Sequence, residues 1–331
     1  MSSIANSPLG ETLELAERLD SVQPPVASWW TNALVWTLRH QPWLPRTVRP
    51  VAPWCAWRVS RLLRTNLMLN ARRILGEQSS LAQRRALGLG VLANFMQFIT
   101  EIARAPDMSD EQLAAQLAGA EGVDAYRQAR AMRRGAVLVT AHLGAFEIGM
   151  FALRREEPNV HVVFRRDALP GFESLRAKLR RRLGVLEAPV DDGLAGWVRL
   201  RDALCNNEVV LLQGDRVMPG QRGRTLPFMG GHMMFPTGPV KLALATGAPI
   251  VPIFAPRDAD GRVRILLQEP IVLDGGDRSP ATIDDGLRRI AAAIESQVRA
   301  HPAQWLTLHR AWCEDAPDAV GQRVAKADRA G

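Results

Sequence analysis

The sequence predicts an α/β fold with a mostly parallel central sheet flanked by helices, and an N-terminal helical segment at a membrane interface. Two observations predict the sheet. Short apolar runs such as AVLVTA at 136–141 have the length and continuity of buried strands. Segments with apolar residues at helical spacing separate these runs, and this alternation is typical of a parallel sheet covered on both faces. With 331 residues and 47% hydrophobic content, the chain is long enough to bury such a core.

The first part of the chain is expected to be helical. A linking helix that carries several arginines precedes residue 80, and residues 83–104 repeat apolar side chains at helical spacing. A further helix is expected to begin at Ser109, because Ser109 followed by Gln112 is a capping-box pattern.

From residue 135 onward, strands and helices alternate. Strands are expected at 136–141, 160–164, 183–188, 208–213, 249–255 and 262–268. Helices are expected at 145–155, 172–183, 194–205, 237–246 and 283–300, with Thr237 as a helix N-cap. A glycine-rich loop is expected at 214–235, either as a flexible lid or as an ordinary surface loop.

These elements divide the chain into three regions. Residues 1–80 form a Trp/Arg-rich membrane-interface region with its linking helix, residues 81–315 form a catalytic domain, and residues 316–331 form a polar tail that we expect to be disordered.

The charge of the chain is strongly positive, with a formal net charge of +8 and a pI near 10.5. Lysines are few, so arginine carries nearly all of it. Such a surface suits nucleic acid, anionic lipid headgroups, or a phosphorylated substrate or carrier. Arginine also offers a planar fork for phosphate. A high-GC genome would raise the arginine content without any function, and this alternative stays open.

Cysteine use points to a reducing compartment. The three cysteines are far apart and lie in no Cys/His cluster, which argues against a disulfide framework and against a zinc site. We expect no metal and no cofactor. The first 28 residues lack the pattern of a signal peptide. The sequence contains no run of 18 apolar residues, so we expect no clear transmembrane helix.

Residues 29–57 have an unusual composition. They contain six of the nine tryptophans, interleaved with arginines and interrupted by prolines. Tryptophan favours the membrane–water boundary and arginine reaches lipid phosphates, so this segment predicts an interfacial anchor. Two alternatives remain, namely core tryptophans of a helical subdomain and a weak spanning helix.

The sharpest motif is TAHLGAFEIGM at 140–150, which contains His-x4-Glu. His142 and Glu147 would not share a face of a regular helix. They converge if His142 lies in a strand-to-helix turn, permitted by Gly144, and Glu147 lies in the first helical turn. His142 could then take a proton from an attacking hydroxyl while Glu147 holds the imidazole. The alternative is a buried structural histidine and a favourable first-turn acid.

Basic residues recur elsewhere. Arg165 and Arg166 follow an expected strand, where a phosphate could be held, although a solvated loop is the alternative. Residues 176–182 form a dense basic run that we interpret as attracting a lipid surface or an acidic carrier. His161, His232, His301 and His309 are given no catalytic role.

Four blocks in this order resemble the lysophospholipid acyltransferase superfamily, and specifically the late lipid A (lauroyl/myristoyl) acyltransferases. The blocks are the His-x4-Glu motif, VVFRRDALPGFESLRAKLRRRLG at 162–184, the segment 211–257, and HPAQWLTLHRAWCED at 301–315. The resemblance extends from about residue 60 to residue 313.

The resemblance implies roles for individual residues. It implies that His142 is the general base with Glu147 as its partner, and that Arg165 faces a phosphate of the acceptor or carrier. Asp215 matches the acid of the family's Asp-Gln-like pair, whereas Arg216 departs from the commoner Gln and leaves the acceptor open. The expected partners are acyl carrier protein, or acyl-CoA, as donor, a glycolipid acceptor and a membrane surface.

The sequence therefore predicts an O-acyltransferase that acts directly, without an acyl-enzyme, on a lipid A precursor or a related glycolipid at the cytoplasmic face of the inner membrane. No GxSxG elbow is present to supply a serine nucleophile. Alternatives are another acceptor (a phosphatidylinositol mannoside, a glycerophospholipid or an envelope pigment), a nucleic-acid-binding protein, and an inactive lipid-binding scaffold. We expect no nucleic-acid partner, because no helix-turn-helix, RRM or zinc signature is found.

Overall fold

The computed structural model describes residues 51–166, 170–218 and 221–315, together with the side chains of these residues except 170–172. Residues 29–50 of the expected interfacial anchor and the tail 316–331 lie outside the described residues.

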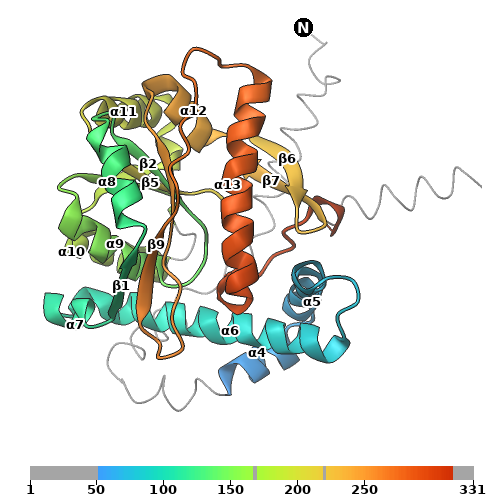
Figure 1. Ribbon diagram of the computed structural model, residues 1–331. Coiled ribbons are helices and arrows are strands. Elements are labelled where there is room, and N and C mark those ends of the chain that lie inside the picture. Colours follow the sequence, from blue (N-terminus) through green and yellow to red (C-terminus); the bar gives the residue numbers. More distant parts are fainter. Residues whose placement is uncertain (1–50, 167–169, 219–220, 316–331) are drawn as a thin grey trace, which may run out of the picture.

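Helices and strands alternate through most of the described chain (Figure 1). The α-helices are α4 (Ala52–Val59), α5 (Arg61–Leu75), α6 (Leu81–Arg104), α7 (Asp110–Ala114), α8 (Val123–Ala131), α9 (Phe146–Glu156), α10 (Pro170–Leu183), α11 (Gly193–Cys205), α12 (Gly238–Thr246) and α13 (Pro280–Ala300). The strands are β1 (Leu117–Glu121), β2 (Ala136–Thr140), β3 (Val160–Phe164), β4 (Leu186–Pro189), β5 (Val209–Gln213), β6 (Gly223–Phe228), β7 (Gly231–Pro236), β8 (Ile250–Phe254) and β9 (Val263–Leu267).

The central sheet has seven strands in the order β1-β9-β8-β2-β5-β3-β4. Every neighbouring pair is parallel except β8 and β9, which run antiparallel. The predicted fold class, an α/β protein with a mostly parallel sheet flanked by helices, is confirmed.

The core lies on both faces of this sheet. Strand β2 is buried along its whole length, and its successive side chains enter different clusters because side chains alternate across a strand. Val137 and Val139 pack with α12, α13 and the β6–β7 hairpin. Ala136 and Leu138 pack with α8, α9 and α10. A strand covered on both sides has to be apolar at every position, which explains the continuous run AVLVT.

Local sequence signals match several element boundaries. Ser109 caps α7 and forms the expected capping box with Gln112. Ser80 and Gln83 form a second capping box at the start of α6. Thr237 occupies the N-cap position of α12, but its hydroxyl donates to the Arg222 carbonyl instead of capping the helix.

The prediction of a glycine-rich loop at 214–235 is wrong for most of that segment. Residues 223–236 form the antiparallel β6–β7 hairpin, which turns at Met229 and Gly230, both with positive φ. Phe228 and Phe235 from this hairpin are buried against Trp312 and Trp305, so the hairpin belongs to the core. Strand β1 and helix α8 were not predicted from the sequence. Strand β1 (LAGAE) is short and mostly exposed, and helix α8 (VDAYRQARA) has few large apolar side chains.

The N-terminal helices pack on α6, which runs below the sheet (Figure 1). Trp57 of α4 and Leu67 of α5 are buried with Val91 and Leu92 of α6. Residues Leu81–Asp107 are long and apolar enough to cross a membrane by length and composition, with a mean hydropathy of 1.4, although 39% of the window is buried against the protein. Core helices of soluble proteins also meet this criterion.

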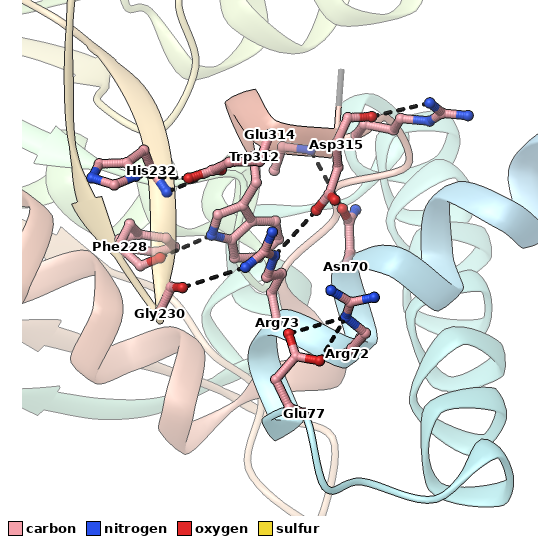
Figure 2. A network of polar contacts seen from close by, with 12 residues as sticks. Asn70, Arg72, Arg73, Glu77, Phe228, Gly230, His232, Trp312, Glu314 and Asp315 are labelled. Carbon is pink, nitrogen blue, oxygen red and sulfur yellow. Dashed lines mark hydrogen bonds and ion pairs between the residues drawn. The ribbon is translucent and has the colours of Figure 1, made fainter. Parts of the chain in front are cut away.

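The segment that follows α13 ties α5 to the hairpin (Figure 2). Arg73 of α5 donates to the Asp315 carboxylate at 3.2 Å and to the Gly230 carbonyl at 3.3 Å. The Trp312 indole donates to the Phe228 carbonyl at 2.8 Å, and Glu314 pairs with His232 at 2.7 Å. The C-terminal segment is therefore an integral part of the domain.

The turn between β2 and α9 leaves no space for a side chain at Gly144. Its φ is +69°, and a Cβ there would lie 2.2 Å from the Ala255 carbonyl oxygen. Gly230 has a similar φ of +75°, but a Cβ there would meet nothing within 4 Å. A side chain at Gly230 would therefore meet backbone strain alone, whereas a side chain at Gly144 would meet the same strain and a steric collision.

We predict that Gly144→Ala lowers the free energy of unfolding by about 3 kcal/mol or more, because it adds a collision to the cost of a left-handed alanine. Gly230→Ala should cost only about 1 kcal/mol. Urea unfolding of both variants measures the difference. Equal losses would contradict a tightly closed turn at Gly144.

Candidate active site

The register of the sheet brings His142 and Asp215 together. Strands β2 and β5 are parallel neighbours, and Thr140 is paired with Gln213 at their carboxyl ends. Two residues beyond that pair, the chain reaches His142 on one side and Asp215 on the other. In parallel α/β sheets this edge is where ligands bind.

Asp215 is the carboxylate that holds His142. Its Oδ1 lies 2.8 Å from the imidazole Nδ1, and its Oδ2 accepts the His142 backbone N–H at 3.0 Å. Oδ2 also accepts the indole N–H of Trp305 at 2.9 Å. Burial alone would raise the pKa of Asp215, but the charge and hydrogen bond of His142, with Arg216 and Trp305, outweigh it and hold this pKa below its ordinary value. Asp215 is therefore a carboxylate at neutral pH, and Nδ1 carries the ring hydrogen.

Glu147 lies where the sequence analysis placed it, in the first turn of α9, but its contact is different. His142 and Glu147 share no hydrogen bond or ion pair among the contacts of the described residues. The buried Glu147 carboxylate accepts from Arg176 Nε at 3.1 Å and lies 2.9 Å from its Nη2. The expected pairing of Glu147 with the imidazole is thus replaced by Asp215.

The turn that carries His142 is fixed by backbone hydrogen bonds. The N–H of Gly144 donates to the Gln304 carbonyl at 3.0 Å, and that of Ala145 donates to the Ala255 carbonyl at 2.8 Å. The His142 carbonyl accepts the N–H of Leu306 at 2.7 Å. The N–H groups of Gly144 and Ala145 are therefore occupied and are not open to an oxyanion.

A large cavity opens beside His142. Its volume is about 1130 Å³, above the roughly 300–1,000 Å³ of pockets for drug-sized ligands. One wall is apolar, and exposed side chains at the start of α11 continue it to the surface: Leu194, Trp197 and Val198. A cavity of this size with an apolar wall suits a long, partly apolar ligand.

The remaining wall is basic. The cavity is lined by Arg165, Arg166, Arg176, Arg201, Arg216, Arg222 and Lys241, whereas Asp191 is the one acid among the described lining residues. The expected substrate-binding residues Arg165 and Arg216 therefore share a cavity with His142. Arg216 is half-buried, and its Nε is buried without a hydrogen-bond partner. Asp215 lies behind His142 instead of in the lining.

The basic run at 176–182 was expected to attract a lipid surface or an acidic carrier, but most of its side chains make ion pairs within the protein. Arg180 is buried between Glu173 and Glu187 and stacks on Phe164, with its guanidinium carbon 3.8 Å from the ring centre. Lys178 pairs with Asp107, and Arg182 pairs with Asp110. Most of this run therefore fastens α10 to its neighbours.

Trp305 and His309 also lie in the surroundings of Asp215, and no role at the site was predicted for either from the sequence. Trp305 follows α13 by five residues and reaches Asp215 across the sheet edge. Burial and the charge of Arg216 lower the pKa of His309 to about 4, so its imidazole is neutral at pH 7. Trp305 and His309 both lie in the block 301–315 that carries part of the family resemblance. That this block contacts the site of His142 and Asp215 is visible only in the folded structure.

Two aromatic rings support His142 from the α6 side. Phe146 meets the imidazole edge-on with ring centres 6.0 Å apart, and Phe98 of α6 packs on Phe146 at 5.0 Å.

In the described part of the chain, no group of three or more His, Cys, Asp or Glu side chains is placed to hold a metal ion.

Comparisons with known proteins identify the family of this chain. The family described as bacterial lipid A biosynthesis acyltransferase matches residues 17–314. A phosphatidylinositol mannoside acyltransferase of Mycobacterium tuberculosis (strain CDC 1551 / Oshkosh) is 29% identical over 230 residues, which is 68% of this chain and 69% of the relative. A protein of the same description from Mycolicibacterium smegmatis is 27% identical over 232 residues, 69% and 72% of the two chains.

The family match spans the seven-stranded sheet, the His142 turn, the basic cavity and the C-terminal tryptophans. The protein is an acyltransferase and belongs to the bacterial lipid A biosynthesis acyltransferase family.

Proposed function

We propose that this protein transfers a fatty acyl group from a thioester donor to a hydroxyl of a glycolipid, with His142 as general base. The observation that carries the proposal is the His142–Asp215 pair at the mouth of the large cavity. The family's description supports acyl transfer in a lipid pathway.

The proposed base is oriented by Asp215. Because the charged Asp215 accepts the Nδ1 hydrogen, Nε2 is the ring nitrogen left to take the hydroxyl proton. Asp215 also stabilises the imidazolium that forms when Nε2 takes the proton. The acceptor oxygen bonds to the thioester carbon, the carbon–sulfur bond breaks, and the imidazolium returns the proton to the leaving thiolate.

Arg216 is the proposed partner of the tetrahedral oxyanion. It follows Asp215 directly, lines the cavity with His142 and has a buried Nε without a partner. Donors that await the developing charge in a cavity lower the barrier more than donors in water. Arg165, on the neighbouring strand end, is proposed to contact a phosphate of the acceptor or carrier, and Glu147 to hold Arg176 in the wall.

The proposed acceptor is a glycosylated membrane lipid. The family's description names lipid A biosynthesis, and the relatives compared above are described as phosphatidylinositol mannoside acyltransferases. A sugar-bearing lipid is common to both descriptions. We therefore keep the lipid A precursor as the first candidate and the phosphatidylinositol mannoside as the second, with acyl carrier protein or acyl-CoA as donor and no nucleic-acid partner.

We further propose that the protein works on a membrane surface, at the cytoplasmic face of the inner membrane. Helices α4 and α5 expose the apolar side chains of Trp54, Val59 and Leu62, and Leu81 of α6 is exposed beside them. Arginines line the adjoining groove, namely Arg58, Arg64, Arg72, Arg84 and Arg85. Exposed apolar groups among arginines are typical of surfaces that bind anionic bilayers. The division into residues 1–80 and 81–315 remains part of this proposal.

We predict that His142→Ala lowers kcat by about 10³- to 10⁴-fold, because no other group takes the hydroxyl proton. Since alanine leaves the buried Asp215 without its partner, His142→Gln is the second variant. The protein is incubated with membranes and labelled acyl donors, and the product is followed by mass spectrometry. Undiminished turnover in a folded variant would remove the mechanism.

We predict that Asp215→Asn lowers kcat by about 10²- to 10⁴-fold, because an amide no longer fixes the tautomer or stabilises the imidazolium. Glu147→Gln should cost about tenfold or less and should show little additional loss when combined with Arg176→Gln. Steady-state kinetics of the four variants test this. A larger loss in Glu147→Gln than in Asp215→Asn would favour Glu147 as the partner of the base.

A further inference from the structure

Two cations of the cavity wall differ from most of the others in their surroundings. Among the described residues, neither Arg222 nor Lys241 makes an ion pair or a side-chain hydrogen bond, although both line the cavity. Other wall cations are neutralised: Arg176 by Glu147, Arg166 by Asp191, and Arg201 by Asp202. Arg216 also lacks an ion pair among the described residues, but it lies next to the buried Asp215 and is already the proposed partner of the oxyanion, which leaves Arg222 and Lys241 without an assigned role.

The fold brings these two residues to one place. The Arg222 carbonyl accepts both the N–H of Thr237 at 3.0 Å and its hydroxyl at 3.2 Å. Lys241 lies one turn further along α12, where its N–H donates to the Thr237 carbonyl at 3.1 Å. Thr237 thus fixes the backbone of both cations at the start of α12.

Arg224 of β6 offers a comparison with a structural arginine close by in the chain. It lies two residues beyond Arg222 on the β6–β7 hairpin, is exposed like Arg222, and pairs with Asp284 of α13 at 3.1 Å. It does not line the cavity. Arg222 and Lys241 both line the cavity and lack an anionic partner among the described residues, so an anionic ligand group would supply the partner that both cations lack.

An apolar wall adjoins this pair. The Trp197 ring packs close to Gly238, where a Cβ would lie 3.4 Å from the indole, and Leu194 and Val198 stand exposed on the same helix. A ligand bound here meets two cations and an apolar surface together. A phosphate ester attached to an apolar chain has this combination of groups.

We infer that Arg222 and Lys241 form a phosphate-binding subsite for an amphiphilic substrate of the cavity. The inference deepens the proposed function and rests on it, because the phosphate would belong either to the glycolipid acceptor or to the pantetheine arm of the donor. The subsite anchors the substrate through two charge-assisted contacts while the hydroxyl or thioester reaches His142.

Binding of hexyl phosphate to the full-length protein, followed by ³¹P NMR titration, tests the subsite without any turnover. We expect Arg222→Gln and Lys241→Gln each to weaken binding by about tenfold or more, and the double variant to abolish it. Lys241→Arg should retain most of the affinity, and Arg224→Gln, the matched control, should bind as the wild type does. Hexanol, followed by ligand-observed ¹H NMR, should bind far more weakly. Wild-type affinity in the double variant, or an equal loss in Arg224→Gln, would overturn the inference.

Steady-state kinetics then identify the source of the phosphate. If the acceptor supplies it, Lys241→Gln raises KM for a phosphorylated glycolipid and leaves KM for a neutral one unchanged. If the donor supplies it, KM rises for acyl-CoA and not for an acyl thioester of N-acetylcysteamine. Unchanged KM values for all four substrates would overturn the subsite. Retained turnover in His142→Ala, with cation-dependent binding of hexyl phosphate, would instead reject the proposed mechanism and keep the subsite.

Discussion

The buried carboxylate of Asp215 joins three distant parts of the chain. It accepts hydrogen bonds from the ring and the backbone of His142, after β2, and from the indole of Trp305, after α13. An isolated buried charge is costly, and a carboxylate with several donors is tolerated because these replace its lost water. The position of Asp215, the tautomer of His142 and the path of residues 301–309 are therefore set together.

The central strands β2, β5 and β8 were predicted well because they are covered on both faces and hence continuously apolar, whereas the mostly exposed edge strand β1 was missed. The sequence did not predict strand order, and the link between His142 and Asp215 depends on β2 and β5 being neighbours. Glu147 was misjudged for a related reason. Sequence spacing placed it in the first turn of α9, but only the packing of α10 shows that the carboxylate meets Arg176. The β6–β7 hairpin was missed because its glycines and prolines obscure the strand pattern.

Charge has two different uses in this molecule. Most cations of α10 pair with acids of neighbouring elements and hold the domain together. Several cations of the cavity wall, by contrast, come from strand ends and from the start of α12, where the chain turns and side chains are less constrained by packing. A count of arginines in the sequence does not separate these two uses, because paired arginines and cavity arginines both occur in arginine-rich stretches of the sequence. Their partners in the fold separate them.

The dependence of Asp215 on Trp305 also bears on how the protein is made. His142 and Asp215 leave the ribosome long before residue 305, so during synthesis the carboxylate lacks its indole donor and the His142 turn lacks its contacts with Gln304 and Leu306. Domains fold largely as units while the chain emerges, and contacts between distant residues form late. In a nascent chain that ends before α13 is complete, the surroundings of His142 and Asp215 are therefore unfinished, and residues 304–306 complete them.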